Sequence, residues 1–165
     1  MSITADIRAT WRGPRAVIRR QLAGGQREDR ALAYVMGACL LIFVAQLPRL
    51  AREAHIDASI PLDARLQAAL LGWLMLAPLF LYGVAAVSHI LAKIFGGKGD
   101  WFGARLALFW SMLASTPLWL FHGFVSGFIG EGSGVTVAGI LLLLGFGAMW
   151  FLSLAEAEGF GAKTA

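Results

Sequence analysis

Charged residues are scarce in this chain of 165 residues. Asp, Glu, Lys and Arg together make up 15% of it, against roughly 25% in a typical soluble domain. Apolar residues make up 58% of the chain. So few ionic groups could not cover the surface of a soluble globule of this size, and that class of protein is excluded.

The shortage of charge is concentrated in four stretches, which contain no Asp, Glu, Lys or Arg: 31–48, 66–92, 106–130 and 132–155. Each stretch is long enough to cross a hydrocarbon layer of about 30 Å as a helix. The alternating segments of about ten residues that build a membrane β-barrel are absent. We therefore predict an all-α integral membrane protein whose domain at 31–155 is a four-span transmembrane helical bundle, with spans at about 31–48, 66–92, 105–130 and 133–155.

Metal- and cofactor-binding residues are also few. The one cysteine, Cys39, lies inside the first apolar stretch, so an intrachain disulfide is excluded. The histidines lie at different depths: His55 in a loop, His89 near the end of the second span and His122 in the opposite half of the third. No carboxylate is predicted at their depth. We expect no metal and no cofactor, with His122 bonded to a backbone carbonyl near Pro117 and His89 reaching the membrane interface.

The spans lack the ionised groups that ion-coupled transporters keep in the membrane. Small multidrug antiporters need a glutamate in the first span, where this chain has only Gln46. No Ser or Cys lies beside a His and a carboxylate, and no phosphate-binding loop with its Lys-Ser/Thr occurs. The expectation is a protein that is not an enzyme.

Basic residues gather at one end, where segment 1–30 holds seven arginines. An excess of Lys and Arg marks the cytoplasmic side of a membrane protein. We predict an inner (plasma) membrane location with the N-terminus in the cytoplasm, and an even number of spans returns a short tail, 156–165, to the same side. The other basic residues are spread thinly over the loops, which argues against nucleic-acid binding.

Segment 1–30 has the pattern of two short helices broken at Gly13-Pro14. Apolar residues recur every four positions and arginines occupy the other faces, which is typical of an amphipathic helix lying at the membrane interface. The interpretation is a cytoplasmic surface that binds anionic lipid headgroups or an acidic partner, although the arginines could instead only fix topology. The candidate lipid- or partner-binding residues are Arg8, Trp11, Arg12, Arg15, Arg19 and Arg20.

Prolines and small residues inside the spans predict kinks and close helix contacts. Pro78 and Pro117 lie near the middle of the second and third spans, where nearby hydroxyls can bond the carbonyl that a proline frees. Small residues spaced by four let helices approach closely, within one chain or between chains. The candidate packing residues are Pro78, Ser111, Ser115, Pro117, Gly123 and Gly127.

The run from Leu91 to Arg105, with its Gly-Gly-Lys-Gly turn, and the small residues before Pro117 resemble the centre of the Yip domain. This family of small polytopic membrane proteins is named after Ypt-interacting proteins, and the likeness is to its bacterial branch. The resemblance implies the helical fold and supplies no catalytic residues. Eukaryotic relatives are linked to Rab-type GTPases and have five spans with a longer, acidic N-terminus, from which this chain departs.

Together these patterns predict a scaffold or accessory subunit that acts through lipid contacts and as part of a larger membrane complex or a homo-oligomer. The alternative is an oligomeric unit for permeation of a small solute or ion. In that case the kinks at Pro78 and Pro117 would open a path lined by Ser111, Ser115, Thr116 and His122.

Overall fold

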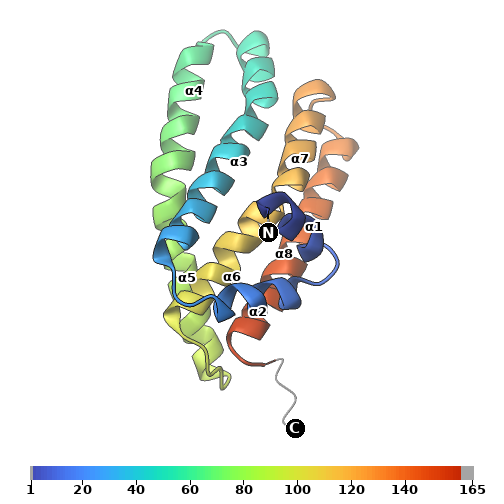
Figure 1. Ribbon diagram of the computed structural model, residues 1–165. Helices are drawn as coiled ribbons and strands as arrows, with labels where there is room; N and C mark the ends of the chain where they lie inside the picture. Colours follow the sequence, from blue (N-terminus) through green and yellow to red (C-terminus); the bar gives the residue numbers. More distant parts are fainter. Residues whose placement is uncertain (1, 161–165) are drawn as a thin grey trace.

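The computed structural model describes residues 2–160, so Met1 and residues 161–165 of the predicted tail lie outside the described residues. The chain forms helices joined by short turns (Figure 1). In chain order these are α1 (Ile3–Thr10), α2 (Pro14–Ala23), α3 (Glu28–Ile56), α4 (Leu62–Leu71), the π-helical segment η1 (Gly72–Leu76), α5 (Ala77–Ile94), α6 (Trp101–Ala114), α7 (Thr116–Phe128) and α8 (Ser133–Ala157).

Three helical stretches are long and apolar enough to cross a membrane: α3, the continuous run Leu62–Ile94 and α8. The pair α6 and α7 passes the same test as a unit but is bent by 45° at its junction. The described chain therefore has three candidate spans, or four if the bent pair is one span. The helical fold and the apolar segments agree with the prediction of an all-α membrane protein.

The first two predicted membrane spans form longer helices than the sequence indicated. The helix α3 continues through Pro48 to Ile56, and α4 already begins at Leu62, so the predicted loop 49–65 shrinks to a short turn. Arg49 and Glu53 pair one helical turn apart, and such a pair favours helix. The charged residues after Pro48 end the apolar stretch, but the helix α3 continues through them to Ile56.

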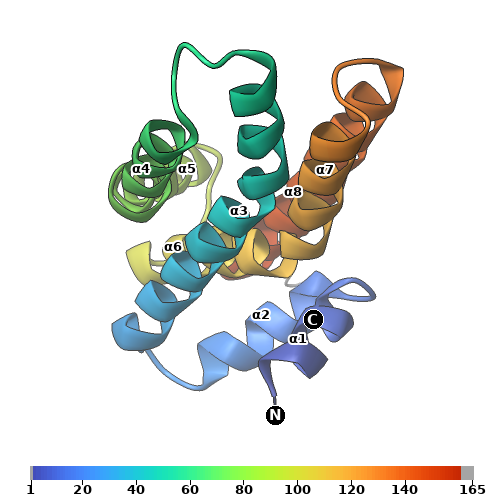
Figure 2. The ribbon, with the colours of Figure 1, turned by 90° about the horizontal axis from the view of Figure 1, so that it is seen from above.

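The bundle has two ends. We call basal the end formed by α2, the α5–α6 turn and the end of α8, and distal the end formed by the α3–α4 and α7–α8 turns. Seen from above, α1 and α2 lie along one side of the bundle, with α4 and α5 on another (Figure 2). Helix α6 packs against α3, α5, α8 and the two N-terminal helices.

Helix α6 forms the centre of the core. Apart from Arg105, every residue from Phe102 to Ala114 is buried, and Trp110 and Phe109 are fully so. A helix that is apolar on all sides can be covered by protein or by lipid, and here protein covers it. It is therefore a core element of the bundle.

The N-terminal helices pack directly against the bundle. The break between them falls at Gly13-Pro14, where the sequence predicts it, and the hydroxyl of Ser2 caps α1. In α2, Val17 and Ile18 are buried, and the helix packs on α8. The apolar face of α2 is thus covered by protein and is not available to lipid.

Side chains complete the hydrogen bonds at the α6–α7 bend. Pro117 has no N–H, which frees the carbonyl of Leu113 four residues earlier. The hydroxyl of Thr116 donates to this carbonyl at 2.8 Å, and that of Ser115 donates to the carbonyl of Met112 at 2.9 Å. The predicted use of hydroxyls at this kink is therefore seen, whereas the buried hydroxyl of Ser111 has no partner within the described residues.

Pro78 lies in the first turn of α5, directly after η1, and is buried. The helix stays continuous there, and the widened π-helical turn lies just ahead of the proline. Proline lacks the backbone N–H that a regular helix uses, and a π-helical turn is a common way for a helix to continue past such a missing hydrogen bond.

Glycines set the distance between α3 and α7. A side-chain carbon at Gly123 would overlap the carbonyl oxygen of Ala45, and one at Gly127 would overlap Pro48. Small residues allow helix backbones to approach this closely. The Gly123 and Gly127 face is thus used within the chain.

We predict that Gly123→Ala destabilises the fold, because the new methyl group must displace the backbone of α3. Overpacking of this kind costs about 1–3 kcal/mol. Thermal unfolding of the purified protein in detergent measures the loss. The control is Gly147→Ala, which adds the same group in α8 where nothing lies within 4 Å. Equal unfolding temperatures for the two variants would contradict the close packing of α3 and α7.

Candidate functional site

Two of the predicted surface arginines connect helices. Arg19 of α2 donates to Glu156 of α8 at 2.6 Å, and this hydrogen bond raises the pKa of the Arg19 guanidinium above its usual range. Arg20 pairs with Asp6 and so links α2 to α1. Both arginines are exposed, and ion pairs at such positions contribute little to stability.

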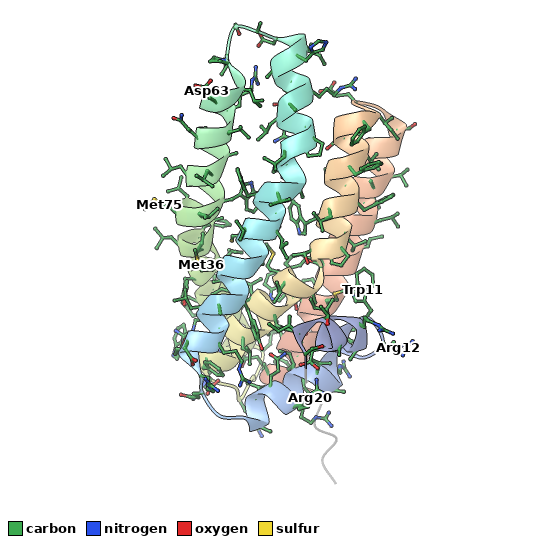
Figure 3. The ribbon with its side chains drawn as sticks, turned by 45° about the horizontal axis from the view of Figure 1, so that its top comes forward. Trp11, Arg12, Arg20, Met36, Asp63 and Met75 are labelled. Carbon is green, nitrogen blue, oxygen red and sulfur yellow. The ribbon has the colours of Figure 1, made fainter. Side chains whose placement is uncertain are left out.

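The other three, Arg8, Arg12 and Arg15, are exposed and make no ion pair within residues 2–160. The side chain of Arg12 points away from the bundle (Figure 3). We call these three residues the arginine surface. Arg15 lies near the carboxylate of Glu156, which already pairs with Arg19, so the charges of Arg8 and Arg12 are the most fully available to a partner.

Trp11 has a structural role beside this surface. Its indole N–H donates to the carbonyl of Ala114 at 3.1 Å, at the bend between α6 and α7, while 46% of the residue is exposed. Next to it, the buried hydroxyl of Thr10 accepts a hydrogen bond from the indole of Trp110 at 2.9 Å. These two bonds hold α1 against the centre of the bundle.

A buried acid–base pair lies at the basal end. Nδ1 of His89 is 2.6 Å from Oε1 of Glu158, and their side chains are 2% and 0% exposed. Glu158 directly follows α8, and its second oxygen accepts the backbone N–H of Gly99 at 3.2 Å. Both carboxylate oxygens are therefore bonded, as burial of such a group requires.

The Gly-Gly-Lys-Gly turn is shaped to receive this carboxylate. Gly96 ends α5 in the left-handed region with φ +88°, which glycine adopts without cost. Side-chain carbons at Gly97 or Gly99 would lie 2.8 Å from the same oxygen of Glu158, and the N–H of Lys98 donates to the carbonyl of Glu158 at 2.8 Å. The turn and the end of α8 form one unit.

A cavity of about 550 Å³ lies beside the pair, and we call it the basal cavity. The polar side chains of His89, Lys93 and Asp100 line it together with the indole of Trp101. The rings of Trp101 and His89 lie 4.5 Å apart, centre to centre. The site thus combines a few polar side chains with apolar walls, to which Ile90 and Ile94 also contribute.

One prediction about this region was wrong: a carboxylate, Glu158, does lie at the depth of His89 and is paired with it. The predicted even number of spans would bring the end of the second span and the end of the last to the same side, but no local signal in the sequence pairs two residues 69 positions apart. The buried Glu158 also means that the predicted tail begins inside the fold.

His122 lies elsewhere, in a cavity of about 890 Å³ at the distal end. Gln46 and Ser126 line the same cavity, and Arg52 lies against Gly130 at its edge. The predicted hydrogen bond from His122 to a backbone carbonyl is not found in the part of the chain that the structure describes. His122 and His89 therefore belong to separate sites.

Neither cavity has the ligands of a metal centre. Among residues 2–160, no three His, Cys, Asp or Glu side chains come close enough together to hold an ion. His89 and Glu158 supply two donor groups, and these are bonded to one another. Cys39 is buried in the core, away from both cavities.

We predict that Glu158→Ala destabilises the protein strongly, because it leaves His89 and the N–H of Gly99 buried without a partner. Loss of one member of a buried ion pair costs about 3–5 kcal/mol. The matched control is Glu156→Ala, which removes the pair with the exposed Arg19 without breaking a bond to His89 or Gly99, and should cost about 1 kcal/mol or less. Thermal unfolding compares the two variants, and equal losses would show that the buried pair is unimportant.

Comparison with known proteins assigns neither site, since no family model, no curated protein and no solved structure matches this chain.

Proposed function

We propose that this is a four-span inner-membrane protein without enzymatic activity, which acts as a scaffold or accessory subunit through contacts with lipids and another protein. In this proposal α6 and α7 form one bent span, and both ends of the chain are cytoplasmic. The packing of α2 on α8 supports this topology, because it brings the N-terminal helices and the end of the last span to the same end of the bundle.

The observation that carries the proposal is the free charge of the arginine surface. Arg8 and Arg15 project from helices that are packed onto the core, and Arg12 from the turn between these helices, so their backbone positions are held by the fold. Three exposed cations that form no ion pair within residues 2–160 attract anionic headgroups or the acidic face of a protein. A rigid basic surface suits recognition by contact.

The alternative function, permeation through an oligomer, has less support. The hydroxyls of Ser115 and Thr116, which would line a path, are buried and bonded to backbone carbonyls. The core helix α6 fills the middle of the bundle below them. His122 of the proposed lining lies instead in the separate cavity at the distal end.

Membership of the Yip family is part of the same proposal. The Gly-Gly-Lys-Gly turn that carries the resemblance is the turn that receives Glu158, and its glycines therefore serve the fold. The GTPase binding of eukaryotic relatives is not carried over, because the N-terminus here is short and rich in arginine.

The test is the triple variant Arg8→Gln, Arg12→Gln, Arg15→Gln. We expect it to insert and fold normally but to lose most of the partner protein or anionic lipid that co-purifies with the wild type from gently solubilised native membranes. Mass spectrometry of the purified material measures both. The loss follows from removing three charges that form no ion pair in the described chain, each worth roughly 1 kcal/mol near an anionic surface.

The control is the double variant Arg19→Gln, Arg20→Gln, which removes two arginines that are already paired within the chain. It should keep its co-purifying partners. Unchanged co-purification by the triple variant would overturn the proposed role of the arginine surface. Reporter fusions at the two ends of the chain test the topology, and opposite sides would refute four spans.

A further inference from the structure

We propose that the basal cavity binds the headgroup of a phospholipid, specifically a zwitterionic phosphoethanolamine headgroup. Its phosphate would lie at Lys93 and His89 and its ammonium group at Asp100. This site lies between α5 and α6, apart from the arginine surface, and does not depend on the function proposed for that surface.

The charges that line the cavity balance. Lys93 is exposed at the end of α5 and makes no ion pair in the described part of the chain. Glu158 is buried behind His89 and does not line the cavity. Asp100 supplies one negative charge. A cavity with one free cation and one carboxylate complements a headgroup that carries one charge of each sign better than it does a purely anionic one.

The polar atoms are already held in place. Glu158 fixes the imidazole of His89 through Nδ1, which leaves Nε2 as the ring's second polar atom. Asp100 accepts the N–H of Gly103 at 2.7 Å and the amide of Gln26 at 2.6 Å. A carboxylate has about four acceptor positions, so Asp100 can accept from an ammonium group as well. Groups fixed in advance lose little freedom when a ligand binds.

The remaining walls suit the apolar part of a lipid. Ile90 and Ile94 line the cavity and are 50% and 72% exposed on α5, which belongs to a candidate membrane span. Trp101 is 52% exposed at the start of α6, and tryptophan favours the level of the headgroups. A soluble phosphate compound would gain nothing from these exposed isoleucines, so the source of the phosphate is a lipid.

The size of the cavity agrees with a bound headgroup. Its volume of about 550 Å³ falls within the range of roughly 300–1,000 Å³ that is usual for small-molecule sites. It opens beside the α5–α6 turn, whose backbone is fixed by Glu158. The turn thus forms a rigid edge of the site.

The experiment is native mass spectrometry of the full-length protein in detergent, titrated with phosphatidylethanolamine, with phosphatidylglycerol or with inorganic phosphate. We expect one phosphatidylethanolamine to bind in preference to phosphatidylglycerol. Lys93→Gln should weaken this binding about tenfold, as expected for loss of one hydrogen bond to a charged group. Lys93 is exposed, so this variant should fold, and thermal unfolding verifies that it does.

Lys98→Gln is the matched control, because Lys98 is also exposed and lies nearby, on the α5–α6 turn, but does not line the cavity. It should bind as the wild type does. Equal losses for both lysine variants, no loss for Lys93→Gln, or equal binding of phosphatidylglycerol would overturn the proposal. Displacement of the lipid by inorganic phosphate would show that the site takes a soluble phosphate and would overturn it as well. The triple arginine variant should keep this lipid, so failure of one proposal is distinguishable from failure of the other.

Discussion

The burial of α6 is the constraint on which the rest of the structure depends. Lipid could cover a helix that is apolar on every side, but protein surrounds this one, and α3, α5 and α8 provide only part of that cover. The N-terminal helices α1 and α2 supply the missing cover, which makes an arginine-rich segment a part of the folded core. The arginine surface is rigid for this reason: its helices cannot leave without exposing the centre of the bundle.

The bend between α6 and α7 is a second consequence of that arrangement. Every backbone polar group in a low-dielectric interior needs a partner, and Pro117 removes one. Two hydroxyls and the indole of Trp11 bond carbonyls at this point. The residue that anchors α1 also serves the bend, so the N-terminal helices and the bent pair are coupled through one hydrogen bond.

The basal end is organised by a single carboxylate. Glu158 bonds the imidazole of His89 and the backbone of the Gly-Gly-Lys-Gly turn, which joins α5, α6 and α8. The glycines of that turn are required because the carboxylate and the end of α8 occupy the space of their side chains. A buried, fully bonded pair leaves the neighbouring cavity with Lys93 and Asp100 as its charged groups, and this gives the cavity its balanced character.

The sequence alone determined the class of protein, because long stretches without ionic groups can be stable only as apolar helices. It also located the break at Gly13-Pro14 and the use of hydroxyls beside Pro117, since both follow from the local chemistry of proline. It could not place α6 at the centre, since apolar residues facing lipid and apolar residues facing protein look alike in composition. Nor could it pair His89 with Glu158: the two are 69 positions apart, and only the packing of α5 and α8 on α6 brings them within hydrogen-bond distance.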